Sequence, residues 1–320
     1  MNEKQFIEQH LSDWQWLNLF LSNPKPTLSQ INTFPKRYRL LCTQLATAQA
    51  NGFSYALINK LNDLAIRGHA KLYRQRRRFS TVISDYLSLD LPQTVRREWR
   101  WILLATLLFL LSIFIGMLSV WLNWGWMEAF SLHDKLTELY EPSAHARIGE
   151  AREGADDVTM WGYYIFNNTA ISLKALAGGI LAGLLTVYIV IFNGIMLGIS
   201  FAFTASQNWL MPTFFPFIIT HAAFELSALI FAAAVGFALA SALLFPKRMS
   251  RKDNLQRRVK ELFPLLPAVI LFDIIAAAIE AFFSPRLLPI VIKLSVGITV
   301  WLLLIAYFLW MGRTRRATLN

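Results

Sequence analysis

The sequence has few charged residues and long stretches with none. Charged residues make up 16% of the 320 residues and hydrophobic residues 55%, whereas soluble domains average about 25% charged. No Asp, Glu, Lys or Arg lies between Ala175 and Phe224. The apolar runs after residue 100 are long enough to cross a bilayer, which takes about 20 residues. The composition therefore predicts an all-α, polytopic helical membrane protein.

Other features are scarce, and each absence excludes a class of function. Cys42 is the single cysteine, so an internal disulfide and a cluster of thiolate metal ligands are excluded. The sequence has no Gly-rich phosphate loop, no nucleotide motif and no visible catalytic triad. We therefore expect a protein that is not an enzyme and has no cofactor. The first ten residues contain acids and no apolar core, which argues against a cleavable signal peptide.

The net charge of +11 would be compatible with nucleic-acid binding, but its distribution favours another explanation. Basic residues concentrate before the first apolar run, in residues 247–261 and in the tail. In membrane proteins such segments flank the spans on the cytoplasmic side. We interpret the basic run at 73–78 as a juxtamembrane face that contacts anionic membrane lipids, and we expect no nucleic-acid partner.

Changes in composition divide the chain into seven segments. The expected segments are a cytoplasmic helical domain (1–98), a first transmembrane helix (99–123), an extracytoplasmic acidic loop (124–166), a Gly-rich membrane core with broken helices (167–246), a basic cytoplasmic loop (247–262), two transmembrane helices (263–311) and a basic cytoplasmic tail (312–320). The first segment opens with apolar residues at the spacing of one helix face, namely Phe6, Trp14, Leu17 and Phe20.

The basic segments also predict the orientation of the chain. The positive-inside rule places them, and both termini, in the cytoplasm. The core 167–246 must then cross an odd number of times. We expect helices near 167–192, 194–209 and 214–245, which gives six spans in total. Four spans plus a re-entrant region is the alternative, because a tight break at membrane depth is tolerated where it is buried in protein.

Five polar residues are expected to form a polar membrane core. His221 and Glu225 are four residues apart and share a helix face, and ionisable residues inside a membrane usually face the bundle interior. The pair is compatible with a proton or ion relay, a structural pair, or metal ligation. Catalytic zinc normally has three protein ligands and this pair supplies two, so the sequence predicts no metal site. Asp273, Lys174 and Asn193 complete the expected core.

Acids and lysines in the last spans suggest further pairs. Asp273 and Glu280 are seven residues apart and lie on one face of a helix. Glu280 is placed to pair with Lys293 across a short turn, and Asp273 to line a polar cavity with Glu225. Lys174 is expected to extend to the outer interface, with a salt bridge to one of the glutamates as the alternative.

Small residues and asparagines mark the expected helix contacts and ends. Two pairs of glycines are spaced four residues apart, Gly179 with Gly183 and Gly194 with Gly198. This spacing lets helix backbones approach closely. A homodimer through these glycine faces is one expectation. Asn167 and Asn168 are expected to cap a helix, and Asn193 followed by Gly194 to break one.

Taken together, these motifs resemble the stage II sporulation protein M family of bacterial integral membrane proteins. The family pattern has paired asparagines before a Gly-rich helix, then Asn-Gly, then His-Gly-x-x-Glu; here Ala222 replaces the glycine that follows His221, which puts in doubt a very close backbone approach at that point. The resemblance in the cytoplasmic domain rests on Asn62, Asp63, Leu64, Arg67, His69 and Tyr73.

The resemblance implies a multi-span inner-membrane protein with a cytoplasmic helical domain. In endospore formers the family's namesake works with two peptidoglycan hydrolases during engulfment, as their membrane scaffold. Relatives in bacteria that do not sporulate are often encoded beside MoxR-type ATPases, and this chain is similar to that longer group.

Two functions follow as hypotheses, and an intramembrane enzyme is the weakest third, since no complete catalytic set is visible. The first is a non-enzymatic scaffold or assembly factor that links envelope proteins, through residues 124–166, to a cytoplasmic partner such as a MoxR-type ATPase system. The second is a transporter or channel component in which His221, Glu225 and Asp273 are the working residues. Convergence of these three residues on a wet cavity would favour transport.

Overall fold

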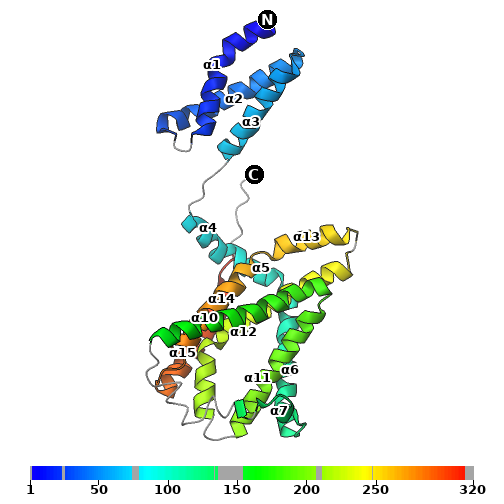
Figure 1. Ribbon diagram of the computed structural model, residues 1–320, viewed down its shortest axis with the longest axis vertical. Coiled ribbons are helices and arrows are strands. Elements are labelled where there is room, and N and C mark those ends of the chain that lie inside the picture. Colours follow the sequence, from blue (N-terminus) through cyan, green and yellow to red (C-terminus); the bar gives the residue numbers. More distant parts are fainter. Residues whose placement is uncertain are drawn as a thin grey trace. The chain divides into compact units, whose positions relative to one another are not determined.

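The computed structural model describes residues 2–23, 26–73, 79–132, 134–135, 154–206, 211–246 and 248–313, all in helices, turns or short connections. The chain forms two compact units, Met1–Thr81 and Val82–Asn320. We call them the N-terminal unit and the membrane unit. Figure 1 labels the helices of both.

The N-terminal unit packs three helices, α1 (Glu3–Ser22), α2 (Leu28–Ala50) and α3 (Tyr55–Tyr73). The four apolar residues that the spacing of α1 picks out are all buried, as predicted. They pack against side chains from the other two helices, and the buried set is Phe6, Trp14, Leu17, Phe20, Phe34, Leu41, Ala48, Leu57, Leu61 and Leu64. The unit therefore has a hydrophobic core of its own.

A capping box fixes the start of α2. The Thr27 hydroxyl accepts a hydrogen bond from the Gln30 backbone N–H at 3.4 Å, and the Gln30 side chain accepts one from the Thr27 N–H at 3.0 Å. This reciprocal pair satisfies two backbone donors that the helix itself leaves free.

Replacing Thr27 with alanine is expected to destabilise the first turn of α2 by about 1 kcal/mol, because N-cap hydroxyls contribute that much. Hydrogen exchange of the full chain should show faster exchange in this turn. Thr33→Ala is the matched control, since the Thr33 hydroxyl bonds back to the Ser29 carbonyl within the helix and caps nothing. Equal exchange in the two variants would contradict the assignment of the cap.

The first unit ends earlier than the expected boundary at residue 98. Residues 82–98 belong to the membrane unit, where α4 (Phe79–Asp85), a π-helical segment (Tyr86–Asp90) and α5 (Leu91–Arg97) precede the first span. The Tyr86 hydroxyl donates to the Pro264 carbonyl at 2.9 Å, and the Tyr307 hydroxyl donates to the Leu87 carbonyl at 2.5 Å. These long-range bonds attach the segment to later helices, which sequence spacing alone does not reveal.

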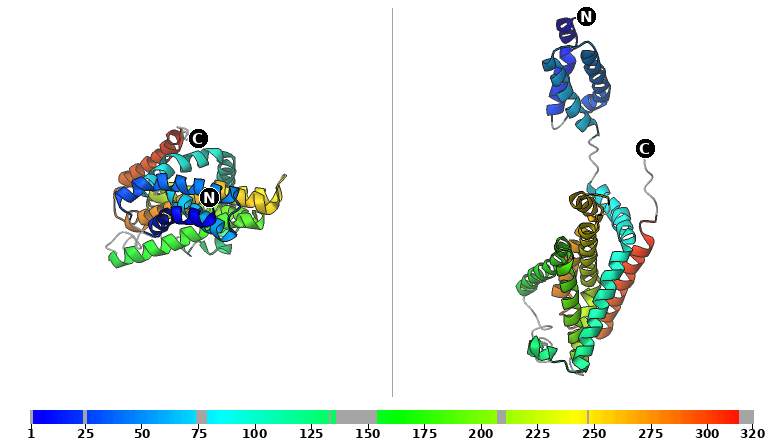
Figure 2. Two further views of the ribbon diagram at one scale, coloured as in Figure 1. Left: turned by 90° about the horizontal axis from the view of Figure 1, so that it is seen from above. Right: turned by 90° about the vertical axis from the view of Figure 1, so that its right-hand side faces the viewer.

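Five of the described helices are long and apolar enough to cross a membrane. They are α6 (Trp99–Trp121), α11 (Leu184–Ser206), the Phe214–Leu244 part of α12 (Met211–Leu244), α14 (Leu265–Phe282) and α15 (Ile290–Trp310). The protein is thus a polytopic helical membrane protein, as predicted. In Figure 2 the long helices of this unit run alongside one another, with α13 (Arg251–Leu262) at one end and α7 (Trp126–Ala129) at the other.

A sixth long helix, α10 (Gly154–Ala177), accompanies these five. Near its start, Asp157 accepts a hydrogen bond from Arg286, which follows α14. Just past its end, Gly179 packs against the Gly236 backbone in the second half of α12. At 1.5 Å per residue α10 is about 36 Å long, and in Figure 1 it lies obliquely across the neighbouring helices.

The helix boundaries around α10 differ from those expected. The acidic segment 124–166 is not a loop throughout, because α10 already begins at residue 154. The expected helix 167–192 is divided by a 3₁₀ turn at Gly178–Leu181 and by Ala182 and Gly183, both with positive φ. The expected break at Asn193-Gly194 is absent, since α11 runs unbroken through both residues. In the sequence, Gly178-Gly179 and Gly183 were therefore a stronger turn signal than Asn193-Gly194.

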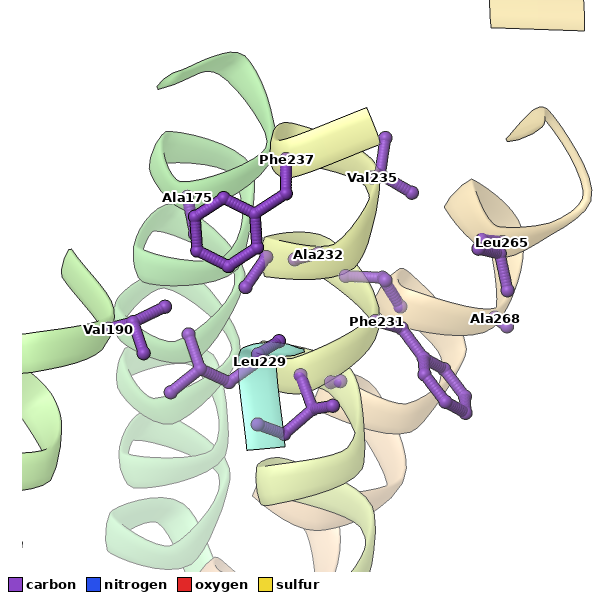
Figure 3. Packing of buried hydrophobic residues seen from close by; sticks show 14 of the residues in the cluster. Ala175, Val190, Leu229, Phe231, Ala232, Val235, Phe237, Leu265 and Ala268 are labelled. Carbon is purple, nitrogen blue, oxygen red and sulfur yellow. The ribbon is translucent and has the colours of Figure 1, made fainter. Parts of the chain in front are cut away.

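Helix α12 is the centre of the membrane unit. In Figure 3 it lies between the helices that carry Ala175 and Val190 and the helix that carries Leu265 and Ala268. Its second half is rich in alanine, and nearly every side chain there is buried. Such small side chains let neighbouring helices pack closely around it.

The predicted glycine contacts form inside the chain. A Cβ on Gly198 would lie 2.1 Å from the Ile113 carbonyl oxygen of α6, and one on Gly194 would lie 2.6 Å from Ser112 Cβ. Figure 1 shows α6 and α11 side by side. Because the glycine faces are covered by other helices of the same chain, they do not offer the dimer surface that the sequence suggested.

Candidate functional site: a polar cavity among the membrane helices

A cavity of about 540 Å³ lies within the membrane unit. Its wall combines side chains from α6, α10, α11, α12, α14 and α15, and most of it is apolar. Ligand sites commonly have this size and an apolar wall with a few polar groups. The polar residues of the wall are Asn168, Ser172, Asn193, Ser200, His221, Glu225, Asp273 and Glu280.

Helix α12 presents His221 and Glu225 to the cavity from one face, as their spacing predicts. The His221 Nε2 atom lies 3.5 Å from Glu225 Oε2. The imidazole is almost completely buried, whereas the Glu225 side chain is 36% accessible. Since Glu225 also lines the cavity, its carboxylate borders a space that water can occupy.

The other ring nitrogen of His221 is held by the turn that follows α14. Nδ1 lies 3.1 Å from the hydroxyl of Ser284, and this hydroxyl donates to the Ile279 carbonyl at 3.1 Å. The same hydroxyl lies 2.5 Å from the Thr220 Oγ1 atom, so Ser284 joins His221 to a buried network of hydroxyl groups. Sequence reasoning missed Ser284, because a serine in a short turn carries no signal of its own.

Helix α14 adds two carboxylates to the same cavity. Asp273 is fully buried, and its Oδ1 accepts a hydrogen bond from Ser172 at 3.4 Å. The Asp273 Oδ2 atom is buried without a hydrogen-bond partner. Glu280 was expected to pair with Lys293, but it approaches α12 instead. One nitrogen or oxygen atom from each of His221, Glu225 and Glu280 lies within 4.8 Å of the other two.

These carboxylates have no basic counter-ion within the described part of the chain. None of the ion pairs found there joins Glu225, Asp273 or Glu280 to a lysine or arginine. Lys293 donates instead to the Ser284 carbonyl at 2.8 Å. Lys174 is exposed on α10 and does not line the cavity, so its inclusion in the polar core was wrong.

The asparagines occupy different roles from those expected. Asn193 lies inside α11, lines the cavity and donates to the Ile189 carbonyl at 2.8 Å. Asn167 and Asn168 do not cap a helix, because α10 begins thirteen residues before Asn167. Asn168 lines the cavity on the side of Glu280. The two asparagines looked like an N-cap because the polar residues before them, up to residue 166, were assigned to a loop, whereas α10 already includes residues 154–166.

The motif of the N-terminal unit lies on α3, with Leu64 in the core and most of its polar side chains on the surface. Arg67 Nε lies 2.9 Å from Asp63 Oδ2, and Arg67 Nη2 donates to the Asn18 side chain at 2.9 Å. Asn62 and His69 are exposed on the same helix. The side chain of Tyr73 lies outside the described residues.

Comparisons with known proteins match both units. The family model for Stage II sporulation protein M matches residues 105–285, and a Domain of unknown function (DUF8413) matches residues 4–74. An uncharacterized protein of Methanocaldococcus jannaschii is 25% identical over 187 residues, which cover 58% of this chain and 94% of that protein. No solved structure matches the chain significantly. Because the first match spans more than half of the chain and contains most of the cavity wall, the chain belongs to the stage II sporulation protein M family.

Proposed function

We propose that the membrane unit is a transporter or channel component through which small cations pass by way of the polar cavity. The observation that carries this proposal is the convergence of His221, Glu225 and Asp273, with Glu280, on one cavity among membrane helices. Ionisable residues within spans are costly and mark ion and substrate pathways.

The charges at the cavity favour a cation over an anion or a neutral solute. Three carboxylates face it without a lysine or arginine partner among the described residues. A buried carboxylate without a compensating charge is strongly unfavourable. A proton or a metal ion in the cavity would supply that charge, whereas an anion would add to the repulsion.

The proposed orientation follows from the basic end of the bundle. Arg96 and Arg97 lie just before α6, and α13 with its five basic residues lies at the same end, joined to Glu98 by Arg258. The positive-inside rule places this end in the cytoplasm. The N-terminus and C-terminus would then be cytoplasmic in a bacterial inner membrane, and the arginines would contact anionic lipids.

A flux assay tests the proposed function. The full chain is reconstituted in liposomes, and entry of protons or of Mn²⁺ is followed with encapsulated dyes. Glu225→Gln should reduce the flux to that of protein-free liposomes, because the amide cannot carry the charge that binds the cation. Asp156→Asn, an exposed site on α10, is the matched control and should retain flux. Absence of flux with the wild-type chain for both cations would refute the proposal.

A scaffold or assembly factor is the second candidate. The N-terminal unit favours it, since this unit has its own core and matches a separate family model. The partners would be a MoxR-type ATPase system on one side and envelope proteins on the other, and the protein would have no catalytic activity. Deleting residues 2–81 tests this second candidate. If the shortened chain loses its partners but retains cation flux, partner binding belongs to the N-terminal unit and transport to the membrane unit.

A further inference from the structure

We propose that His221, Glu225 and Glu280 bind a divalent first-row transition metal ion in the membrane cavity. The inference deepens the proposed function by naming the class of cation, although binding itself does not depend on transport. The sequence alone argued against metal, because the α12 pair supplies two ligands where three are usual. The structure adds Glu280 from α14 as the third.

The distances between the three groups suit a metal ion after small side-chain movements. One nitrogen and two carboxylate oxygens lie within 4.8 Å of one another, and His221 Nε2 lies 3.5 Å from Glu225 Oε2. Zinc bonds to nitrogen and oxygen are about 2.0–2.2 Å, which places ligand atoms about 3.3 Å apart in a tetrahedral site. The longest of these separations therefore has to close by at most about 1.5 Å, a movement that rotations of the two flexible glutamate side chains can supply.

The hydrogen bonding of His221 prepares the ring for a cation. Nδ1 lies 3.1 Å from the Ser284 hydroxyl, and Nε2 lies 3.5 Å from a Glu225 carboxylate oxygen. Metal-ligating histidines almost always donate their second N–H to a neighbouring acceptor. The Ser284 oxygen is placed to be that acceptor, and the contact orients the ring.

A fourth group points to a ligand independently of this triad. Asp273 lines the same cavity, is fully buried, and has its Oδ2 atom without a partner. Buried polar atoms are normally hydrogen-bonded to protein or to ordered water. A hydrated metal ion would supply a water molecule as donor to Asp273.

The ligand types indicate which metals the site takes. One imidazole with two carboxylates is a mixed nitrogen and oxygen set, which suits Mn²⁺, Fe²⁺, Co²⁺ and Zn²⁺ better than the all-oxygen sites of Mg²⁺ and Ca²⁺. Two glutamates also balance the charge of a divalent ion, so that the occupied site is neutral within its apolar surroundings.

Equilibrium metal binding by the detergent-purified full chain tests the inference. After chelator treatment, the protein is titrated with Mn²⁺, Co²⁺ or Zn²⁺, and the visible spectrum of bound Co²⁺ reports its ligands. We expect one ion per chain and loss of affinity by at least about 100-fold in Glu225→Gln and in Glu280→Gln, since even residues that only orient ligands contribute about 10–100-fold. Ser284→Ala should weaken binding by about 10-fold or more through that orienting contact.

Controls separate this inference from the proposed function. Asp156→Asn should bind as wild type, and thermal unfolding of each variant identifies any that fail to fold. Unchanged affinity in folded Glu225→Gln and Glu280→Gln, or absence of binding by wild type for all three metals, would overturn the inference. Proton flux without metal binding would leave the transport proposal standing alone. Metal binding without flux of any cation would retain the site and refute transport.

Discussion

Replacing Gly198 with alanine is expected to separate α6 from α11 and to lower the free energy of unfolding by about 3 kcal/mol, the upper end of the usual cost of overpacking. The added Cβ would lie 2.1 Å from the Ile113 carbonyl oxygen and 2.9 Å from its carbon. These are backbone atoms of a facing helix, so no change of side-chain rotamer relieves the clash. Thermal unfolding in detergent would measure the loss.

Gly162→Ala is the matched control for this prediction. Gly162 lies in α10, and a Cβ placed there meets no atom within 4 Å. Alanine is favoured over glycine inside a helix by up to about 1 kcal/mol, so this variant should be as stable as wild type or slightly more stable. Equal stability of the two alanine variants would show that the α6–α11 contact is looser than the structure indicates.

Replacing Arg258 with glutamine is expected to cost about 3 kcal/mol of stability, because it leaves the buried carboxylate of Glu98 short of charge. Arg258 donates to both Glu98 oxygens, at 2.7 and 3.2 Å, and so joins α13 to the start of α6. The Glu98 side chain is only 4% exposed. Arg257→Gln is the matched control, since Arg257 is 52% exposed and its pair with Glu261 measures 3.5 Å, a surface contact worth about 0–1 kcal/mol.

The same pair predicts how stability depends on pH. Burial, the largest influence, acts to raise the pKa of Glu98, but hydrogen bonds from Arg258 and Arg97 outweigh it and lower the pKa below the ordinary value. A lowered carboxylate pKa stabilises the fold fully above the unfolded value of about 4.3 and progressively less as the pH falls through the folded value. The stability difference between wild type and Arg258→Gln should therefore shrink below about pH 4. A difference that grows in acid would contradict this assignment.

Local patterns were sufficient for much of the fold. The buried face of α1, the first span and the two last spans follow from hydrophobic periodicity and run length. The shared face of His221 and Glu225 follows from a spacing of four residues. Each of these features is set by residues within one helix, where the geometry is fixed.

Other features depended on signals that compete. Asn193-Gly194 and Gly178-Gly179 both look like breaks, and only the second is one. In α11, Gly194 serves close packing against α6 rather than a turn. A glycine in an apolar segment has either meaning, and its neighbours in space decide which applies.

The sequence by itself determined that this chain is a helical membrane protein, that it has a separate N-terminal helical region, and that a histidine and a glutamate share one face of a buried helix. Asp273 was expected at a polar cavity with Glu225. Only the tertiary structure decided that Glu280 of α14 joins them there, that Ser284 contacts the imidazole, and that Lys174 does not line the cavity. The reason is physical. Helical periodicity fixes which side chains share a face, whereas the packing of small residues such as Gly179 and Gly236 fixes which faces meet.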